Sequence, residues 1–251
     1  MKRKSHPTRE RILDAAEELF ARDGFAAVTV RQIMRKADAD VSLAYYHFKS
    51  KRDLFDSVML RRVNEVNAIR LEALEKVEQR HPDDLPTVEE IIDAFTHPIL
   101  DLLATKHEEW HHYFALIAQI NSSSEWGGEL MTRYFDPLVR RFIDALRHAL
   151  PDCDDADLYW SYHFFSGALT MTMAETGRID NLSSGACKSS DMTSINARMP
   201  QFIAAGFKAI CGRDRSVAQA APQVKPASTR KSAAPGRHGK PKTRAPAARS
   251  K

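Results

Sequence analysis

The chain has 251 residues, of which 43% are hydrophobic, so it can bury a core in one large or two modest domains. No run approaches the roughly 18 apolar residues of a membrane span, and no apolar stretch follows the basic N-terminus as it would in a secretory signal. The cysteines Cys153, Cys187 and Cys211 are widely spaced and form no CxxC pair. We therefore expect a cytoplasmic protein with reduced thiols and no membrane contact.

Charge is unevenly distributed along the chain, although the formal net charge is only +4. Residues 1–60 hold 12 Lys and Arg against 9 Asp and Glu, residues 61–212 hold 14 against 23, and residues 213–251 hold 11 against 1. A basic head, an acidic middle and a strongly basic tail favour contact with a polyanion at both ends of the chain.

The first predicted helix follows from apolar residues at i, i+3, i+4 and i+7 between Ile12 and Phe20. Thr8 is suited to cap its start, and Gly24 is suited to end it because glycine tolerates positive φ. A second helix should begin after Thr29, which has the capping-box spacing to Gln32.

Two more helix starts follow closely. Asp40 should cap a short helix over residues 41–48, and Ser50 should cap a long helix that continues to about Gln79. In the short helix, Ala44 and Phe48 should face inward. A helix, a short helix, a turn and another short helix form the helix-turn-helix pattern, whose second short helix lies in the DNA major groove.

The segment "HPDDLP" interrupts the helical pattern after residue 80, and five more helices follow by periodicity. We expect them over about 87–104, 107–121, 128–149, 155–176 and 191–211. Pro98 and Pro137 should kink or shorten two of them. Residues 177–191 have the Gly/Ser-rich composition of a connection. No β alternation persists, so the fold class is all-α, and residues 213–251 have too few large apolar residues to fold.

The N-terminal segment of residues 8–55 resembles the tetracycline-repressor (TetR) family of bacterial transcriptional regulators. Its most specific piece, "YYHFKSK" at residues 45–51, is similar to the family's Y-x-H-F-x-x-K. In the turn, the family usually has glycine where this chain has Asp38, and Asp tolerates the left-handed conformation well enough to keep the turn.

Composition makes residues 213–251 a disordered basic tail. The resemblance implies a helix-turn-helix domain at 1–55 and a helical ligand-binding and dimerisation domain at 56–212. It implies a homodimer that represses transcription from a palindromic double-stranded DNA operator until a small-molecule effector binds, without a cofactor. In this family the last two long helices usually form the dimer interface.

By position, the family's DNA contacts fall on nine residues of this chain. They are Thr29, Arg31, Val41, Ser42, Leu43, Tyr45, Tyr46, His47 and Lys51. The chemistry of these residues agrees, because phenol hydroxyls, helix N-termini and ammonium groups donate to phosphates, and apolar side chains contact thymine methyl groups. The alternative is that the rings are ordinary residues of an amphipathic helix.

The middle of the chain more weakly resembles TetR members that respond to fatty acids or acyl thioesters, which implies an apolar ligand with an anionic end. The ligand-binding candidates are Trp110, Phe114, Arg133, Tyr134, Arg140, Trp160, Phe164, Met171 and Arg178. The alternatives are plain core or dimer interface for the rings and Met171, and solvent exposure for the arginines. His107 and His111 have an i, i+4 spacing that suits a metal, but a polar helix edge explains them as well, and we assign no metal.

No catalytic set emerges, because GxSxG and a Gly-rich phosphate loop are both absent. We therefore expect a DNA-binding regulator rather than an enzyme. The main alternative is an architectural or nucleoid-associated DNA-binding protein dominated by its basic tail. A helical enzyme that binds a small molecule is a third possibility, and it lacks a convergent acid–base or metal set.

Overall fold

The capping side chains identified in the sequence define the N-terminal helices of the computed structural model, which describes residues 7–123 and 127–212. Thr29 and Gln32 form the capping box of α2 (Val30–Lys36). Asp40 accepts from the backbone of Ser42 at the start of α3 (Val41–His47). Ser50 accepts from the backbone of Asp53 at the start of α4 (Lys51–Gln79). These boundaries confirm the predicted starts.

The first helix, α1 (Thr8–Ala27), extends slightly beyond its predicted end. Gly24 has φ +80°, so the regular helical geometry breaks where the sequence placed the stop. Pro7 rather than Thr8 is the residue before the helix, and no side chain caps this end. Asp38 adopts φ +50° between α2 and α3, which is the left-handed turn conformation expected of it.

The rest of the described chain is also helical, with α5 (Val88–Thr105), α6 (His107–Asn121), α7 (Gly127–Ala149) and α8 (Asp155–Met173) close to their predicted bounds. The prolines shorten neither helix, since α5 continues through Pro98 and α7 through Pro137. In α5, the carbonyl of Phe95 accepts a hydrogen bond from the Arg70 side chain.

Two predictions about the C-terminal part are wrong. Residues 177–191 include a short helix, α9 (Arg178–Leu182), where a connection was expected. The single last helix is two helices, α10 (Met192–Asn196) and α11 (Met199–Cys211). Pro200 explains the division, because a residue without an N–H suits the first turn of a new helix and not the interior of a continuous one.

The prediction that all three cysteines are reduced thiols is also wrong, because two of them are paired. Cys153, after α7, and Cys211, at the end of α11, form a disulfide, while Cys187 is free and exposed. The two cysteines are 58 residues apart in sequence, yet their Cα atoms lie 4.5 Å apart. Spacing along the chain gave no sign of this proximity, because the packing of α8 against α11 creates it.

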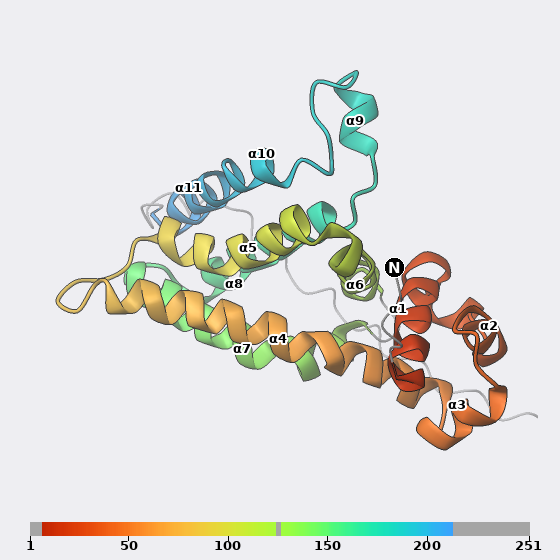
Figure 1. Ribbon diagram of the computed structural model, residues 1–251. Coiled ribbons are helices and arrows are strands. Elements are labelled where there is room, and N and C mark those ends of the chain that lie inside the picture. Colours follow the sequence, from red (N-terminus) through yellow and green to blue (C-terminus); the bar gives the residue numbers. More distant parts are fainter. Residues whose placement is uncertain (1–6, 124–126, 213–251) are drawn as a thin grey trace, which may run out of the picture. The chain divides into compact units, whose positions relative to one another are not determined.

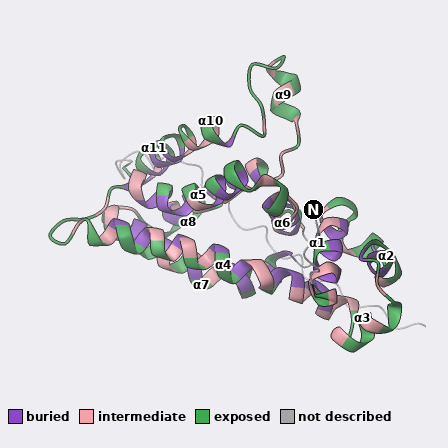
Figure 2. Ribbon diagram, in the orientation of Figure 1, coloured by how far each residue is buried: buried purple, intermediate pink, exposed green. Residues whose placement is uncertain are grey.

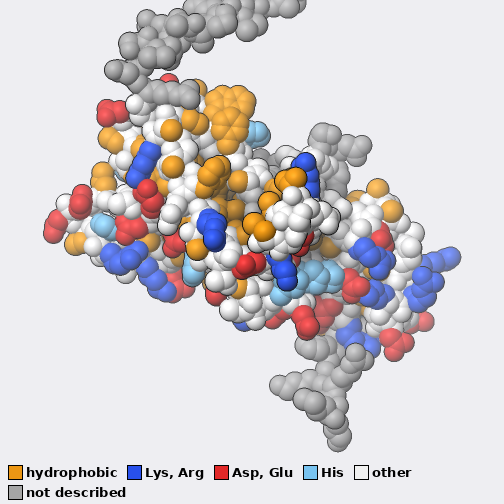
Figure 3. Space-filling view, turned by 90° about the horizontal axis from the view of Figure 1, so that it is seen from above, with side chains coloured by type: hydrophobic (Ala, Val, Ile, Leu, Met, Phe, Trp, Pro, Cys, Tyr) orange, Lys and Arg blue, Asp and Glu red, His pale blue; other side chains and the backbone are white. Residues whose placement is uncertain are grey.

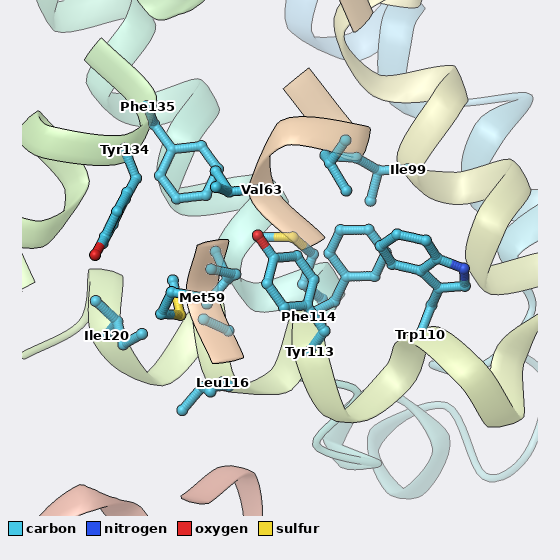
Figure 4. Close-up of a cluster of buried hydrophobic side chains, with 14 of the residues drawn as sticks. Met59, Val63, Ile99, Trp110, Tyr113, Phe114, Leu116, Ile120, Tyr134 and Phe135 are labelled. Atoms are coloured by element: carbon cyan, nitrogen blue, oxygen red, sulfur yellow. The ribbon is translucent and has the colours of Figure 1, made fainter. Parts of the chain in front are cut away.

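The long helix α4 connects the N-terminal helices to the rest of the described bundle (Figure 1). It packs against α1 and also against α5 and α7. Buried residues follow the faces where these helices meet (Figure 2). The core includes large rings from α6, and Trp110, Tyr113 and Phe114 lie among side chains of α4, α5 and α7 (Figure 4). Within the described ranges, no helix has the length and apolarity needed to span a bilayer.

Candidate DNA interface and ligand cavity

The short helix α3 presents two tyrosine rings to solvent. Tyr45 is 71% exposed and Tyr46 is 81% exposed, whereas Ala44 and Phe48 are buried at 3% and 4%. The buried pair fixes the inward face, as the sequence predicted, and helical geometry then directs the two phenols outward. Large exposed rings on a helix that is anchored by its own core residues are available to a partner.

The other predicted contacts on α3 are less uniformly exposed. Val41 is 37% exposed. Ser42 is exposed, but its hydroxyl donates to the Asp40 carboxylate at 2.5 Å, a bond that also lowers the pKa of Asp40. Leu43 is half-buried and packs against the core, so it belongs partly to the inward face. His47 is half-buried, with its ring 4.9 Å from that of Tyr46.

The remaining predicted DNA contacts lie on α2 and α4. The Thr29 hydroxyl is engaged in the capping box with Gln32. Arg31 is exposed and makes no ion pair within the part of the chain that the structure describes. Lys51 does not extend outward, because its ammonium donates to the Ala26 carbonyl at 3.3 Å and lies 4.4 Å from the Phe25 ring centroid. Burial of this ammonium lowers the pKa of Lys51.

Lys49 is an exposed cation that the sequence interpretation did not select. It follows the buried anchor Phe48 directly and precedes α4. Its position beside α3 makes it a further candidate for a phosphate contact. The signal was present in the sequence, since Lys49 and Lys51 flank the capping residue Ser50.

Charged side chains connect α1 to α4. The Arg61 guanidinium donates to Asp14 at 2.6 Å and to Glu17 at 2.7 Å. Glu17 is only 4% exposed, and burial raises its pKa while the cations of Arg61 and Arg62 oppose that shift. Arg62 also donates to Glu109 on α6 at 3.0 Å. The DNA-binding helices are therefore joined electrostatically to the ligand-domain helices.

An internal cavity of about 40 Å³ lies between α4, α5, α6, α7 and α8. Of the predicted ligand residues, only Phe114 lines it. Trp110 is fully buried beside Phe114, with their ring centroids 5.7 Å apart, and it packs under the Arg62 guanidinium. Tyr134 is buried in the core and does not line this cavity. The predicted Trp110–Phe114 stripe is thus mainly core.

The other predicted ligand residues do not share one site. Trp160 and Phe164 are 58% and 57% exposed on the outer face of α8, so they are not a ligand wall in the single chain. Arg133 and Arg140 are exposed, lying 3.8 Å from Asp56 and from Asp136 respectively. The reason is helical phase: these side chains lie on the outward faces of α7 and α8.

Met171 and Arg178 line a different feature, an open groove of about 680 Å³ between α8, α9, α10 and α11. The groove wall includes other cations, such as Lys188 and Arg198. The structure thus separates Met171 and Arg178 from Phe114, although all three were ligand-binding candidates in the sequence.

The sequence interpretation missed Arg70, which is 4% exposed and lines the internal cavity. Its Nε donates to the Phe95 carbonyl at 2.9 Å, and its guanidinium lies 3.7 Å from the Phe95 ring centroid. Burial lowers the pKa of Arg70 to about 10. Its spacing in the sequence indicates that it is buried. Val66, Arg70 and Leu74 lie at i, i+4 and i+8, on the buried stripe of α4.

The histidines of α6 form a polar edge. His107 contacts the Glu175 carboxylate at 3.1 Å, and the His111 ring stacks on that of His107 with centroids 4.8 Å apart. Across the described ranges, no group of three or more His, Cys, Asp or Glu side chains is placed to hold a metal ion. This geometry fits the polar-edge interpretation of these residues.

Known proteins match both halves of this architecture. A family model for "Bacterial regulatory proteins, tetR family" matches residues 12–58, and one for "Tetracyclin repressor-like, C-terminal domain" matches residues 93–206. The HTH-type transcriptional regulator SrpR of Pseudomonas putida is 26% identical over 175 residues, which cover 67% of this chain and 74% of SrpR.

Solved structures share the fold. A TetR-family regulator from Bordetella parapertussis 12822 has a TM-score of 0.55 and 17% identity, covering 78% of this chain and 93% of that one. The transcriptional regulator FadR from Bacillus subtilis, solved in complex with stearoyl-CoA, has a TM-score of 0.50 and 15% identity, covering 78% of this chain and 98% of that one. The helix-turn-helix, the helical domain and both family models show that this chain belongs to the TetR family of DNA-binding transcriptional regulators.

Proposed function

We propose that this chain is a cytoplasmic repressor that binds a palindromic operator as a homodimer and is released by a small, mostly apolar ligand. The observation that carries the DNA-binding part is the exposure of Tyr45 and Tyr46 on a helix anchored by Ala44 and Phe48. Phenol hydroxyls at this position donate to DNA phosphates, and Val41 contacts a base edge or a thymine methyl group.

The rest of the proposed DNA surface surrounds α3. Arg31 contributes an exposed guanidinium, and Ser42 and Thr29 contribute hydroxyls that change partners on binding. Lys51 reaches a phosphate only after it leaves Phe25 and Ala26, so Lys49 is the more available cation. Leu43 and His47 contribute their exposed edges. Each cation–phosphate contact releases counterions, so binding should weaken steeply with salt.

The proposed homodimer forms through α8 and α11, which pack together and expose large apolar side chains. The exposed set comprises Tyr159, Trp160, Phe164, Met171 and Phe202. Hydrophobic side chains gather in several places on the face of the molecule that Figure 3 shows. Contiguous apolar surface of this kind marks interaction sites, and a second copy with the same face satisfies it symmetrically.

The proposed division of the chain is 1–55 for DNA binding, 56–212 for ligand binding and dimerisation, and 213–251 for a basic tail. The tail lies outside the described residues, and its proposed role rests on charge alone. In a dimer, two copies of α3 read half-sites about one helical turn apart, roughly 34–36 Å. A ligand that binds one spacing of the two helices better shifts the population towards that spacing.

For the effector we propose the acyl class, a fatty acid or an acyl thioester. Support comes from the apolar cavity walls and from FadR of Bacillus subtilis, whose structure contains stearoyl-CoA. The effect of ligand binding would be transmitted to α3 through α4. This helix contributes Val66 and Arg70 to the cavity and Arg61 to the contact with α1.

A footprint over the promoter beside the gene tests this function. The full chain should protect one short palindrome, and a fatty acid or an acyl thioester should abolish that protection at constant protein concentration. Broad coverage of the DNA without a boundary would favour the architectural alternative. A Tyr45→Ala, Tyr46→Ala double variant serves as the control that should lose the palindrome.

A further inference from the structure

Arg70 is a buried cation without an anionic partner. Among the residues that the structure describes, no carboxylate lies within 4.0 Å of its guanidinium, and its one described hydrogen bond goes to the Phe95 carbonyl. Glu17, a buried carboxylate on α1, is held by Arg61 and Arg62 instead. An unpaired charge is costly to bury, so a cavity that retains one is suited to an anion that arrives from outside.

Polar groups of α6 and α8 line the same cavity. The Tyr113 hydroxyl is fully buried and has no hydrogen-bond partner in the described part of the chain. Asn121 donates to the Thr170 hydroxyl at 2.6 Å and to the Ser166 hydroxyl at 3.2 Å. A guanidinium and a free phenol O–H are two donor types that a carboxylate accepts.

The remaining walls are apolar and fit a hydrocarbon tail. They include Val66, Ile99, Ile117, Phe135, Val139 and Leu169. The cavity volume of about 40 Å³ holds roughly a few water molecules. A ligand longer than a short acid must therefore displace side chains. Met131 and Met173 line the cavity, and their unbranched thioethers adapt readily to a new neighbour.

We propose that this cavity binds the carboxylate of a monocarboxylic acid with an apolar tail, with Arg70 pairing with the carboxylate and Tyr113 donating a second hydrogen bond. The site deepens the proposed ligand-responsive function and rests on it. A free acid is preferred to its ester or thioester, because only the free carboxylate accepts two parallel N–H bonds from the guanidinium. The exposed arginines Arg133 and Arg140 are not needed for it.

Calorimetry and thermal unfolding of the full chain, with straight-chain carboxylic acids of increasing length, test this site. Each acid is compared with its methyl ester and its primary alcohol. We expect each acid that binds to do so about ten- to a hundredfold more tightly than its ester, the range for hydrogen bonds to a charged group. Equal affinity for acid and ester, or no binding by any acid, would overturn the proposal.

Two variants locate the charge. Arg70→Met should remove the preference for acid over ester, whereas Arg80→Met, the same change at the exposed end of α4, should keep it. Tyr113→Phe provides a second test if Arg70→Met does not fold, because it removes a hydroxyl without a described partner and should lower acid affinity while unfolding stays cooperative. Two combinations of results would contradict the site, and in both of them Tyr113→Phe keeps the full preference for acid over ester. In the first, Arg70→Met also keeps that preference; in the second, Arg70→Met does not fold.

Operator binding measured in the same samples separates this site from the proposed function. Acids that bind through Arg70 but leave the operator complex intact would support the site and contradict ligand-controlled release. The opposite result is that no acid binds while an acyl thioester still releases the operator complex. It would contradict the site and leave the proposed function standing.

Discussion

Arg61 on α4 donates to the buried carboxylate of Glu17 on α1, with Nη2 and Oε2 2.7 Å apart. The helix that carries Glu17 packs against α2, and the helix that carries Arg61 also contributes Arg70 to the internal cavity. This ion pair is therefore a direct physical connection between the DNA-binding helices and the cavity wall. A shift of α4 along its axis would strain or break it.

Replacing Arg61 with Ala should lower the free energy of unfolding by on the order of 3 kcal/mol, because it leaves Glu17 buried with only the more distant Arg62 as a cation. Urea unfolding measures this loss. Burial already raises the pKa of Glu17, so its proton is held more tightly in the folded state than in the unfolded state. The loss in Arg61→Ala should therefore be larger at pH 7 than at pH 5, where protonation removes the uncompensated charge.

The matched control is Arg22→Ala, which removes an exposed guanidinium that pairs with its neighbour Asp23. It should leave unfolding unchanged at both pH values. An Arg61→Ala variant as stable as the parent would show that Arg62 alone satisfies Glu17.

Replacing both Tyr45 and Tyr46 with Phe should weaken operator binding by roughly ten- to a hundredfold, about 1 kcal/mol for each hydrogen bond to a phosphate that the change removes. Both hydroxyls are solvent-exposed, so the midpoint of thermal unfolding should not change. Gel-shift titration at fixed salt measures the affinity. Leu85→Ala changes an exposed side chain outside the proposed DNA and dimer surfaces and should bind the operator normally. Unchanged affinity in the double variant would remove these hydroxyls from the DNA surface.

Local signals made the N-terminal half readable from the sequence. Thr29, Asp40 and Ser50 cap helices through side chains next to them in the chain, so spacing alone located α2, α3 and α4. The inward positions of Ala44 and Phe48 followed from helical phase. These features depend on residues within a few positions of one another, which is the range over which a sequence pattern is specific.

Tertiary features of the ligand domain were not readable in this way. Trp160 and Phe164 are apolar and aromatic, and composition cannot decide whether such rings line a cavity or an outer face. Arg70 looked like any helical arginine, although its spacing to Val66 and Leu74 placed it on the buried stripe. The pairing of Cys153 with Cys211 depends on how α8 packs on α11, which no local pattern encodes.

Replacing Trp160 with Glu should dissociate the proposed dimer, because it places a charge on the exposed apolar face of α8. A buried interface tryptophan contributes about 2 kcal/mol or more, so the dimer dissociation constant should rise at least about thirtyfold. Sedimentation equilibrium measures it. Leu85→Glu, an exposed apolar residue outside α8 and α11, is the control that should stay dimeric. A Trp160→Glu protein with parental association would place the interface elsewhere.

Reducing the bond between Cys153 and Cys211 should lower the free energy of unfolding by about 4 kcal/mol, the chain-entropy value for a loop of this length. Thermal unfolding with and without dithiothreitol measures the difference. Cys153→Ser should behave like the reduced parent and lose its response to reductant, whereas Cys187→Ser should respond like the parent. Equal unfolding midpoints in both conditions, with three free thiols by titration, would show that the bond does not form in solution.

Deleting residues 213–251 should weaken binding to any DNA and flatten its dependence on salt, because this segment holds 11 Lys and Arg against 1 Asp or Glu. For every phosphate that the tail no longer neutralises, the slope of log affinity against log salt should become shallower by about 0.9. Preference for the operator should remain, since α3 is intact. A full-length variant with Gln at the Lys and Arg positions of this segment separates charge from length, and it should match the truncation. An unchanged salt slope in both proteins would exclude the tail from DNA binding, whereas loss of operator preference would show that the tail also contributes to specificity.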